Sequence, residues 1–264
     1  MTGLAIGTSG FDYDHWQGRF YPDDLPRARR LEFYARIFST LELNVTFYRT
    51  PKASAFTRWR DSVPDEFRFA VKASRYLTHI RRLRAPREPV EYLMDRVSRL
   101  GDRLGPILVQ LPPDMTVDVE RLGATLEAFG DGPRVAVEPR HPSWFREDVC
   151  RLLAAHGAVM CRVDRRGPRT PAWHTAPWIY VRFHQGRASP FSCYGRTALA
   201  SWADRLRDGG RAPTGYAYFN NDGHACAIRN ALQLERFLSS GSQDGLRNEP
   251  YVRGRFAGAT EENR

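Results

Sequence analysis

The feature that most constrains the fold is a unit of strand, polar loop and helix that recurs along the chain. Its clearest copy begins with a short apolar run at 134–137 and turns abruptly into charged and aromatic residues at 138–145. Alternation along a strand places Ala136, Glu138 and Arg140 on one face. A glutamate and an arginine are therefore predicted to leave this strand side by side. In parallel α/β proteins, the loops after such strands hold the ligands.

Similar units fill most of the chain. The predicted strands are 4–8, 41–48, 67–74, 107–111, 134–137, 158–163, 178–185 and 215–219, and the predicted helices are 31–41, 53–62, 90–104, 118–129, 144–156, 197–206 and 226–238. This alternation predicts an α/β fold, namely one TIM-type (β/α)8 barrel over residues 1–240, followed by a polar tail at 241–264. An open α/β sheet is the alternative. GxGxxG and P-loop motifs are absent from the sequence, which argues against dinucleotide or nucleoside-triphosphate binding in those modes.

Composition narrows the class of protein. No window of about 18 uninterrupted apolar residues predicts a membrane span, and residues 1–10 lack the pattern of a secretory signal, so we expect a cytoplasmic protein without a membrane partner. The cysteines at 150, 161, 193 and 226 show no zinc-site spacing. We therefore expect free thiols, with no disulfide and no structural zinc.

The net charge of +10 raises the alternative of a nucleic-acid partner. The densest basic segment is 76–89, which contains Arg81, Arg82, Arg84 and Arg87. Such a segment is either a phosphate-binding strip or, more simply, a solvated face. Only two of the Lys and Arg residues are lysines, Lys52 and Lys72, so the basic charge is almost entirely arginine.

Polar residues concentrate near the predicted strand ends, where a parallel strand buried on both faces should be apolar. If the strands close a barrel, these residues converge at its carboxyl-end opening: Glu42, Asn44, Lys72, Gln110, Glu138, Arg140, Arg162, Asp164, Arg182 and His184. The alternative is a set of ion pairs that neutralise one another. We favour a site, because so much buried polarity is costly when it serves only a core.

The residue types suggest roles within this site. Glu138, Lys72 and His184 are the candidate acid-base residues, with Schiff-base chemistry as an alternative for Lys72. Arg140 and Arg182 have the geometry for bidentate binding of phosphate or carboxylate. The remaining predicted substrate-binding residues are Asn44, Gln110, Trp16, Tyr48, Trp144 and Asn220. We expect no cofactor and no metal, because arginines beside the carboxylates oppose a divalent cation.

Several motifs together resemble one family, the YecE-like proteins, also called domain of unknown function 72. The resemblance extends to about Leu238 and rests on Ile6-Gly7-Thr8-Ser9-Gly10, His15-Trp16, Glu42-Leu43-Asn44-Val45-Thr46-Phe47-Tyr48, Lys72-Ala73-Ser74-Arg75, Gln110-Leu111-Pro112-Pro113, Glu138-Pro139-Arg140-His141-Pro142-Ser143-Trp144, Tyr180-Val181-Arg182-Phe183-His184 and Tyr218-Phe219-Asn220-Asn221. It implies a TIM-type barrel. It implies no particular activity.

The first functional hypothesis is a metal-independent enzyme that binds a small anionic substrate, phosphorylated or nucleotide-like, and uses acid-base chemistry. Lyase, isomerase and hydrolase reactions stay open at this point, as does the oligomeric state. The second hypothesis is a protein that binds or processes nucleic acid through its arginine-rich surface, which predicts affinity that falls steeply with salt. A ligand sensor without catalysis is the third, since a fold does not fix a function.

Overall fold

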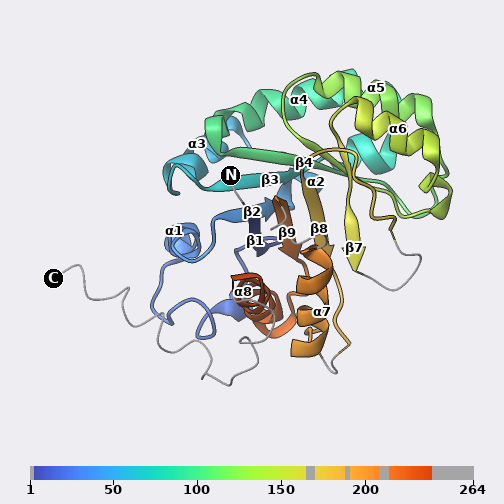
Figure 1. The fold of residues 1–264 in the computed structure, drawn as a ribbon. Coiled ribbons are helices and arrows are strands. Elements are labelled where there is room, and N and C mark those ends of the chain that lie inside the picture. The colour runs from blue at the N-terminus through green and yellow to red at the C-terminus, as the bar shows by residue number, and fades with distance from the viewer. Residues whose placement is uncertain (1–2, 165–169, 188–190, 208–213, 240–264) are drawn as a thin grey trace.

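The computed structural model describes residues 3–164, 170–187, 191–207 and 214–239. Its strands are β1 (Leu4–Thr8), β2 (Thr40–Leu43), β3 (Arg68–Lys72), β4 (Leu104–Gln110), β5 (Val135–Glu138), β6 (Val159–Met160), β7 (Arg162–Asp164), β8 (Ile179–Phe183) and β9 (Gly215–Phe219). Its α-helices are α1 (Arg30–Ala35), α2 (Val45–Tyr48), α3 (Ala53–Asp61), α4 (Arg87–Val97), α5 (Val119–Phe129), α6 (Glu147–Ala155), α7 (Arg196–Leu206) and α8 (Cys226–Ser239) (Figure 1). The tail predicted at 241–264 lies outside the described residues.

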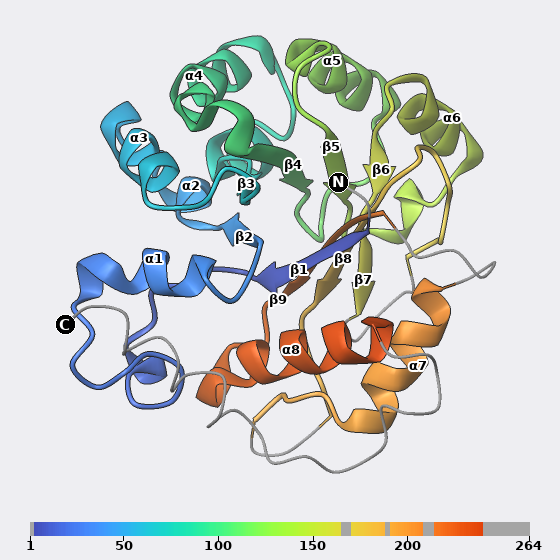
Figure 2. The ribbon, with the colours of Figure 1, turned by 60° about the vertical axis from the view of Figure 1, so that its left-hand side comes forward.

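The strands form two parallel sheets, in the orders β1-β9-β8-β7 and β2-β3-β4-β5-β6. Ser9, which follows β1, forms a parallel bridge with Glu42 of β2, so the sheets meet at one edge. At the other edge, only Cys161 separates β6 from β7 along the chain. Figure 2 shows α3 to α6 outside the larger sheet and α7 and α8 outside the smaller one. The α/β fold with parallel sheets is confirmed, whereas within the described ranges the strand pairing does not close into one barrel.

Two apolar clusters show which way the strand residues point. The smaller cluster, here called the inner core, takes residues from both sheets: Ala5, Ala70, Leu108, Ala136, Val159, Cys161, Trp178, Tyr180, Tyr216 and Tyr218. Strand neighbours such as Phe69 and Val109 belong to the larger cluster, together with helix residues such as Leu93. Because alternate strand residues point to opposite faces, the inner core fills the space between the sheets and the larger cluster packs under the helices.

Several predicted boundaries differ from the structure, among them that of the helix predicted at 31–41, which ends at Ala35, and that of the helix predicted at 90–104, which ends at Val97. The strand predicted at 41–48 ends at Leu43 and gives way to α2, because the Thr46 hydroxyl donates to the carbonyls of Leu43 and Lys72, at 3.0 and 2.7 Å. The predicted strand at 158–163 is divided into β6 and β7, which pair in different sheets. The predicted helix at 144–156 begins only at Glu147, since Ser143 accepts a hydrogen bond from the Val117 amide instead of capping it.

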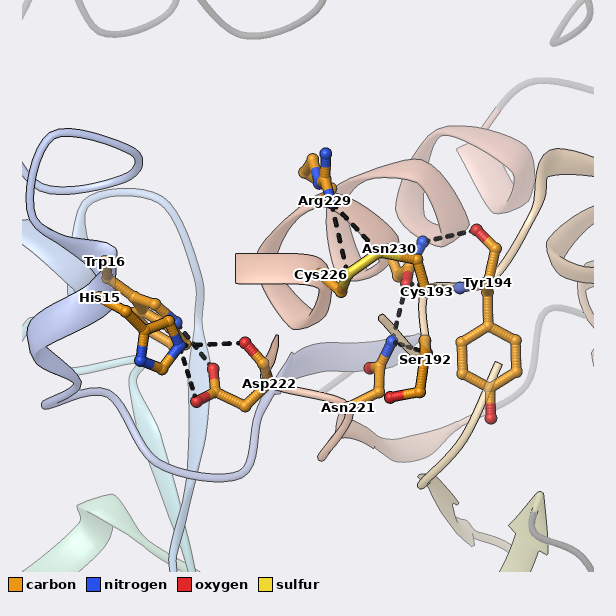
Figure 3. Close-up of a disulfide and its surroundings, with 10 residues drawn as sticks. All are labelled: His15, Trp16, Ser192, Cys193, Tyr194, Asn221, Asp222, Cys226, Arg229 and Asn230. Carbon is orange, nitrogen blue, oxygen red and sulfur yellow. Dashed lines mark hydrogen bonds and ion pairs between the residues drawn. A yellow bond between two sulfur atoms is a disulfide. The ribbon is translucent and has the colours of Figure 1, made fainter. Parts of the chain in front are cut away.

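The prediction that all cysteines are free thiols is wrong. Cys193, in the loop before α7, forms a disulfide with Cys226, the first residue of α8, and their Cα atoms are 5.1 Å apart. Figure 3 shows this bond beside Arg229 and Asn230. The two cysteines are 33 residues apart, and only the fold brings them together. Cys150 and Cys161 are free, as predicted.

Candidate functional site

A chain of buried charges crosses the interior between the two sheets. Glu42 on β2 and Glu138 on β5 are both 0% exposed, and Arg182 on β8 is 1% exposed. Arg182 donates through Nη2 to Glu42 Oε2 at 2.8 Å and through Nη1 to Glu138 Oε2 at 2.7 Å. None of these three strands is hydrogen bonded to another of the three, so the contacts span the interior. We call Glu42, Arg182 and Glu138 the charge bridge.

The charge bridge keeps both carboxylates ionised. Burial alone would raise the pKa of Glu138, but the charge of Arg182, with smaller contributions from His184 and Arg140, holds that pKa well below its usual value. Burial likewise opposes ionisation of Glu42, yet Arg182 and hydrogen bonds from Ser9 and Tyr180 lower its pKa. Although burial disfavours its charge, the two carboxylates keep the pKa of Arg182 well above its usual value. The bridge therefore carries one net negative charge at neutral pH.

Lys72, the last residue of β3, lies at the edge of the charge bridge. Burial, followed by the charge of Arg182, lowers the pKa of Lys72 to about 8, although Glu42 and Glu138 act in the opposite direction. Its Nζ lies 4.0 Å from the centre of the Phe47 ring. Burial together with the charges of Lys72 and Arg140 also lowers the pKa of His79 to about 4, so that imidazole is neutral at pH 7. The pKa of Lys72, about 8, is thus lower than that of an ordinary lysine.

The other predicted polar residues surround Glu138. Gln110 Nε2 donates to Glu138 Oε1 at 2.9 Å, and Arg140 Nε donates to the same oxygen at 3.4 Å. His184 Nε2 lies 3.7 Å from this oxygen, and its Nδ1 is 3.0 Å from the amide nitrogen of Asn220. The predicted placement of Glu138 and Arg140 side by side is therefore observed.

Asn44 follows β2 and occupies the N-cap position of α2, but its side chain forms no capping hydrogen bond. Its Oδ1 is buried without a hydrogen-bond partner among the described residues. A buried carbonyl oxygen without a donor costs free energy, and in a candidate site it is an available acceptor for a ligand.

Two residues predicted to converge with this group point elsewhere. Asp164 Oδ2 accepts a hydrogen bond from Trp202 on α7 at 3.0 Å, so its side chain faces the helices. Arg162 lines a cavity of about 980 Å³ together with Trp202 and Arg205, also on the helical side. The reason is alternation: Cys161 belongs to the inner core, so its neighbour Arg162 and then Asp164 point to the opposite face.

The predicted aromatic ligands are in two different environments. Trp16 and Trp144 are 0% exposed, and their indole nitrogens donate to Asp222 Oδ1 and to the Met115 carbonyl, each at 2.7 Å. Both are packing residues, so the prediction that they contact substrate does not fit the structure. Tyr48 is 81% exposed and is accessible.

Sequence reasoning did not single out several groups that complete the site. Ser9 donates to Glu42 Oε2 at 2.5 Å, and Tyr180 donates to Glu42 Oε1 at 2.7 Å. Alternation already places Tyr180 on the same face as Arg182, which is the signal that could have identified it. The Tyr13 hydroxyl donates to the Ser9 carbonyl at 2.7 Å. Burial raises the pKa of Tyr13, and the negative charges of Asp222 and Glu42 raise it further.

In the part of the chain that the structure describes, no helix has the length and apolarity to cross a membrane. The same residues contain no group of three or more His, Cys, Asp or Glu side chains arranged to hold a metal ion. Two expectations are still predictions, namely that the protein has no cofactor and that it is located in the cytoplasm.

Comparison with known proteins identifies the family. The sequence profile described as "Protein of unknown function DUF72" matches residues 5–252. The chain belongs to the DUF72 family. The UPF0759 protein YecE of Escherichia coli K12 is 34% identical over 116 residues, which cover 44% of this chain and 43% of YecE. The UPF0759 protein YunF of Bacillus subtilis 168 is 29% identical over 271 residues, covering 89% of this chain and 94% of YunF. The resemblance to YecE-like proteins is confirmed, although the matched segment spans less than half of YecE.

Solved structures of DUF72 proteins have a similar fold. A Thermotoga maritima member superposes with a TM-score of 0.78 at 29% identity and covers 90% of this chain and 100% of its own. A member from Enterococcus faecalis gives a TM-score of 0.75 at 20% identity, with coverage of 94% and 99%. The protein SacUVDE, at 8% identity, gives a TM-score of 0.55 with coverage of 88% and 98%. These last two comparisons concern the fold alone.

Proposed function

We propose that this DUF72 protein is an enzyme that binds a small anionic substrate at the carboxyl ends of its strands and uses Lys72 for proton transfer. The observation that carries the proposal is the half-buried Lys72 amine, whose pKa of about 8 gives both protonation states near neutral pH. Such a pKa suits general acid-base catalysis, which is most effective when the pKa lies near the working pH. A lysine in a purely structural ion pair would instead keep its charge.

The proposal gives the charge bridge a supporting role. Glu138 is held ionised, so it serves as a fixed negative charge that orients Arg182, Arg140 and Gln110. Arg182 has a carboxylate at each terminal nitrogen and is 1% exposed. We therefore assign anion binding to Arg140 and Lys72 at the accessible edge, in preference to Arg182. Fixed charges that need no rearrangement during reaction are an effective form of electrostatic catalysis.

His184 is the second proton carrier in this proposal. Glu138 and Asn220 lie near its two ring nitrogens, at 3.7 and 3.0 Å. A carboxylate on one side and an amide on the other fix the orientation of an imidazole, as is usual for catalytic histidines. Asn44, with its buried Oδ1, and the exposed Tyr48 complete the proposed binding residues.

The proposal also treats the two sheets as one irregular (β/α)8 barrel. The Ser9–Glu42 bridge joins β1 to β2, and the amide of Gly10 donates to the Glu42 carbonyl at 2.9 Å. The break between β6 and β7 is a single residue. In barrels of this kind, the residues at the carboxyl ends of strands carry the chemistry, which supports the location of the site.

A thermal-shift experiment with inorganic phosphate and a panel of phosphorylated metabolites and nucleotides tests the proposal. The variant is Lys72→Met, and Lys52→Met is the matched control because Lys52 is the other lysine of the chain and is exposed. We expect an anion to stabilise the wild type and Lys52→Met, each against its own unliganded protein, and not Lys72→Met. Equal stabilisation of all three proteins would overturn the proposal.

Short oligonucleotides test the alternative of nucleic-acid binding in the same experiment. In the basic segment, Arg81, Arg82 and Arg87 each have a carboxylate partner, at 3.7, 2.8 and 3.9 Å, which lowers the positive charge available for phosphates. If oligonucleotides alone stabilise the protein, equally in Lys72→Met and less at high salt, the arginine-rich surface is the binding site and the enzyme proposal fails.

A further inference from the structure

The two sulfurs of the disulfide differ in accessibility. Cys226 is 0% exposed, whereas Cys193 is half-buried. Cys193 lies in the wall of a cavity of about 390 Å³ whose lining residues do not include Cys226. An incoming thiol therefore meets Cys193 first, since thiol-disulfide exchange requires direct access to one sulfur.

The cavity is cationic. Among the described residues, its lining includes Arg196 and Arg229 but no Asp or Glu; the other described lining residues are Cys193, Tyr194, Leu199, Asn230 and Gln233. The amides of Asn230 and Gln233 add hydrogen-bonding groups. A volume of this size accommodates a small molecule, and guanidinium groups favour carboxylates. The cavity therefore fits a small thiol that carries a carboxylate.

Cys226 is positioned to leave as a thiolate. Arg229 Nη2 lies 3.3 Å from Cys226 Sγ and 3.1 Å from Cys193 Sγ. Figure 3 shows the Arg229 side chain next to the disulfide. Cys226 is also the first residue of α8, a helix of 14 residues, and the positive end of a helix dipole stabilises a thiolate. Exchange is faster when the leaving sulfur is a stabilised thiolate.

We propose that Cys193–Cys226 is an exchangeable disulfide, attacked at Cys193 by an anionic low-molecular-mass thiol such as glutathione bound in this cavity. The thiolate forms a bond to Cys193 Sγ, the bond between Cys193 and Cys226 breaks, and the electron pair leaves on Cys226 Sγ. A second molecule of the thiol, as its thiolate, then attacks the sulfur of the first one in the mixed disulfide. The bond between that sulfur and Cys193 Sγ breaks, and the electron pair leaves on Cys193 Sγ. In total, two thiols are oxidised to one small disulfide, and Cys193 and Cys226 are both reduced.

Thiol exchange on the full chain tests this proposal. Titration of the denatured protein should count two thiols before treatment and four after excess glutathione, because Cys150 and Cys161 are the free cysteines. After partial reaction, alkylation and peptide mass mapping should find glutathione on Cys193 and the alkyl group on Cys226. Glutathione on Cys226, or four thiols at the start, would overturn the proposal.

The rates of exchange with different thiols distinguish binding of the thiol in the cavity from unassisted reaction with an exposed disulfide. Glutathione and the cationic thiol cysteamine are compared after each rate is divided by that thiol's rate with free cystine. In the wild type, we expect the normalised rate to be higher for glutathione than for cysteamine. We expect the Arg229→Gln substitution to slow the reaction with glutathione about threefold to fivefold. Arg236→Gln, the same change elsewhere on α8, is the control and should retain the wild-type rate. Equal normalised rates for the two thiols, or equal rates in both variants, would contradict a binding cavity.

Discussion

The inner core and the charge bridge lie between the same strands and have opposite chemistry. β4, β5 and β8 contribute Leu108, Ala136 and Tyr180 to the inner core and, two residues later on the same face, Gln110, Glu138 and Arg182. The apolar layer needs no partners, whereas each buried charge must be matched by another. Buried ion pairs are rarely more stable than apolar packing, so stability alone does not explain the charged layer, and the proposed chemistry at the strand ends would.

Removing the cation from the charge bridge should give the largest effect. Arg182→Met removes the cation that the two buried carboxylates share and leaves Glu138 with only its longer contact to the cation of Arg140. We expect a loss of about 3–5 kcal/mol in the free energy of unfolding at pH 7. Burial then raises the pKa of Glu42 and Glu138 in the folded state above the unfolded value. The loss should therefore shrink as the pH falls toward about 4.5, where both carboxyls can protonate. Urea unfolding at pH 7 and pH 4.5 measures this difference.

The comparison variant lies in the apolar layer. Leu108→Ala creates a cavity at a residue that is 0% exposed and should cost about 2–5 kcal/mol. Because this substitution leaves no buried charge without a partner, the loss in the free energy of unfolding should be the same at both pH values. If the two variants show the same pH dependence, the charge bridge is energetically equivalent to the inner core, and the distinction drawn between the layers is wrong.

The Lys72→Met substitution is expected to increase the stability of the protein, in contrast to the two preceding variants. A lysine whose pKa is lowered to about 8 in the folded protein destabilises the fold while it is protonated. Methionine keeps most of the packing volume without the charge, so we expect a gain of about 1–2 kcal/mol at pH 7. Between pH 8 and the ordinary lysine pKa of 10.5, the unfolded wild type binds more protons than the folded one, so wild-type stability rises and the gain should disappear.

Unfolding of wild type, Lys72→Met and Lys52→Met at pH 7 and pH 10 measures this effect. Lys52→Met should match the wild type at both values, since Lys52 is exposed. A loss of stability in Lys72→Met at pH 7 would mean that Lys72 is a structural ion-pair residue, and its proposed catalytic role would lose its physical basis.

Much of this arrangement could be predicted from the sequence, because alternation within a strand is a local property. It placed Glu138 beside Arg140 and put Tyr180, Arg182 and His184 on one face. Alternation also put Arg162 and Asp164 on one face, but it does not say which face of a strand points to the interior. That direction is set by tertiary packing, which turns Cys161 inward and Arg162 and Asp164 toward the helices. The Cys193–Cys226 pairing and the burial of Trp16 and Trp144 likewise depend on contacts between distant segments.

The smallest expected effect belongs to the surface ion pairs. Arg151 on α6 lies 2.8 Å from Glu147, one helical turn earlier, and both side chains are more than two-thirds exposed. Exposed pairs of this kind contribute little because water and salt screen them, so Arg151→Gln should change the free energy of unfolding by about 0.5 kcal/mol or less. Urea unfolding in low and high salt measures it, and high salt should abolish the difference. The cost of Arg182→Met should persist in the same salt, because screening does not reach a pair that water cannot enter. A salt-sensitive Arg182→Met would mean that solvent enters the charge bridge, and the strand ends would then be an open ionic surface, not a preorganised site.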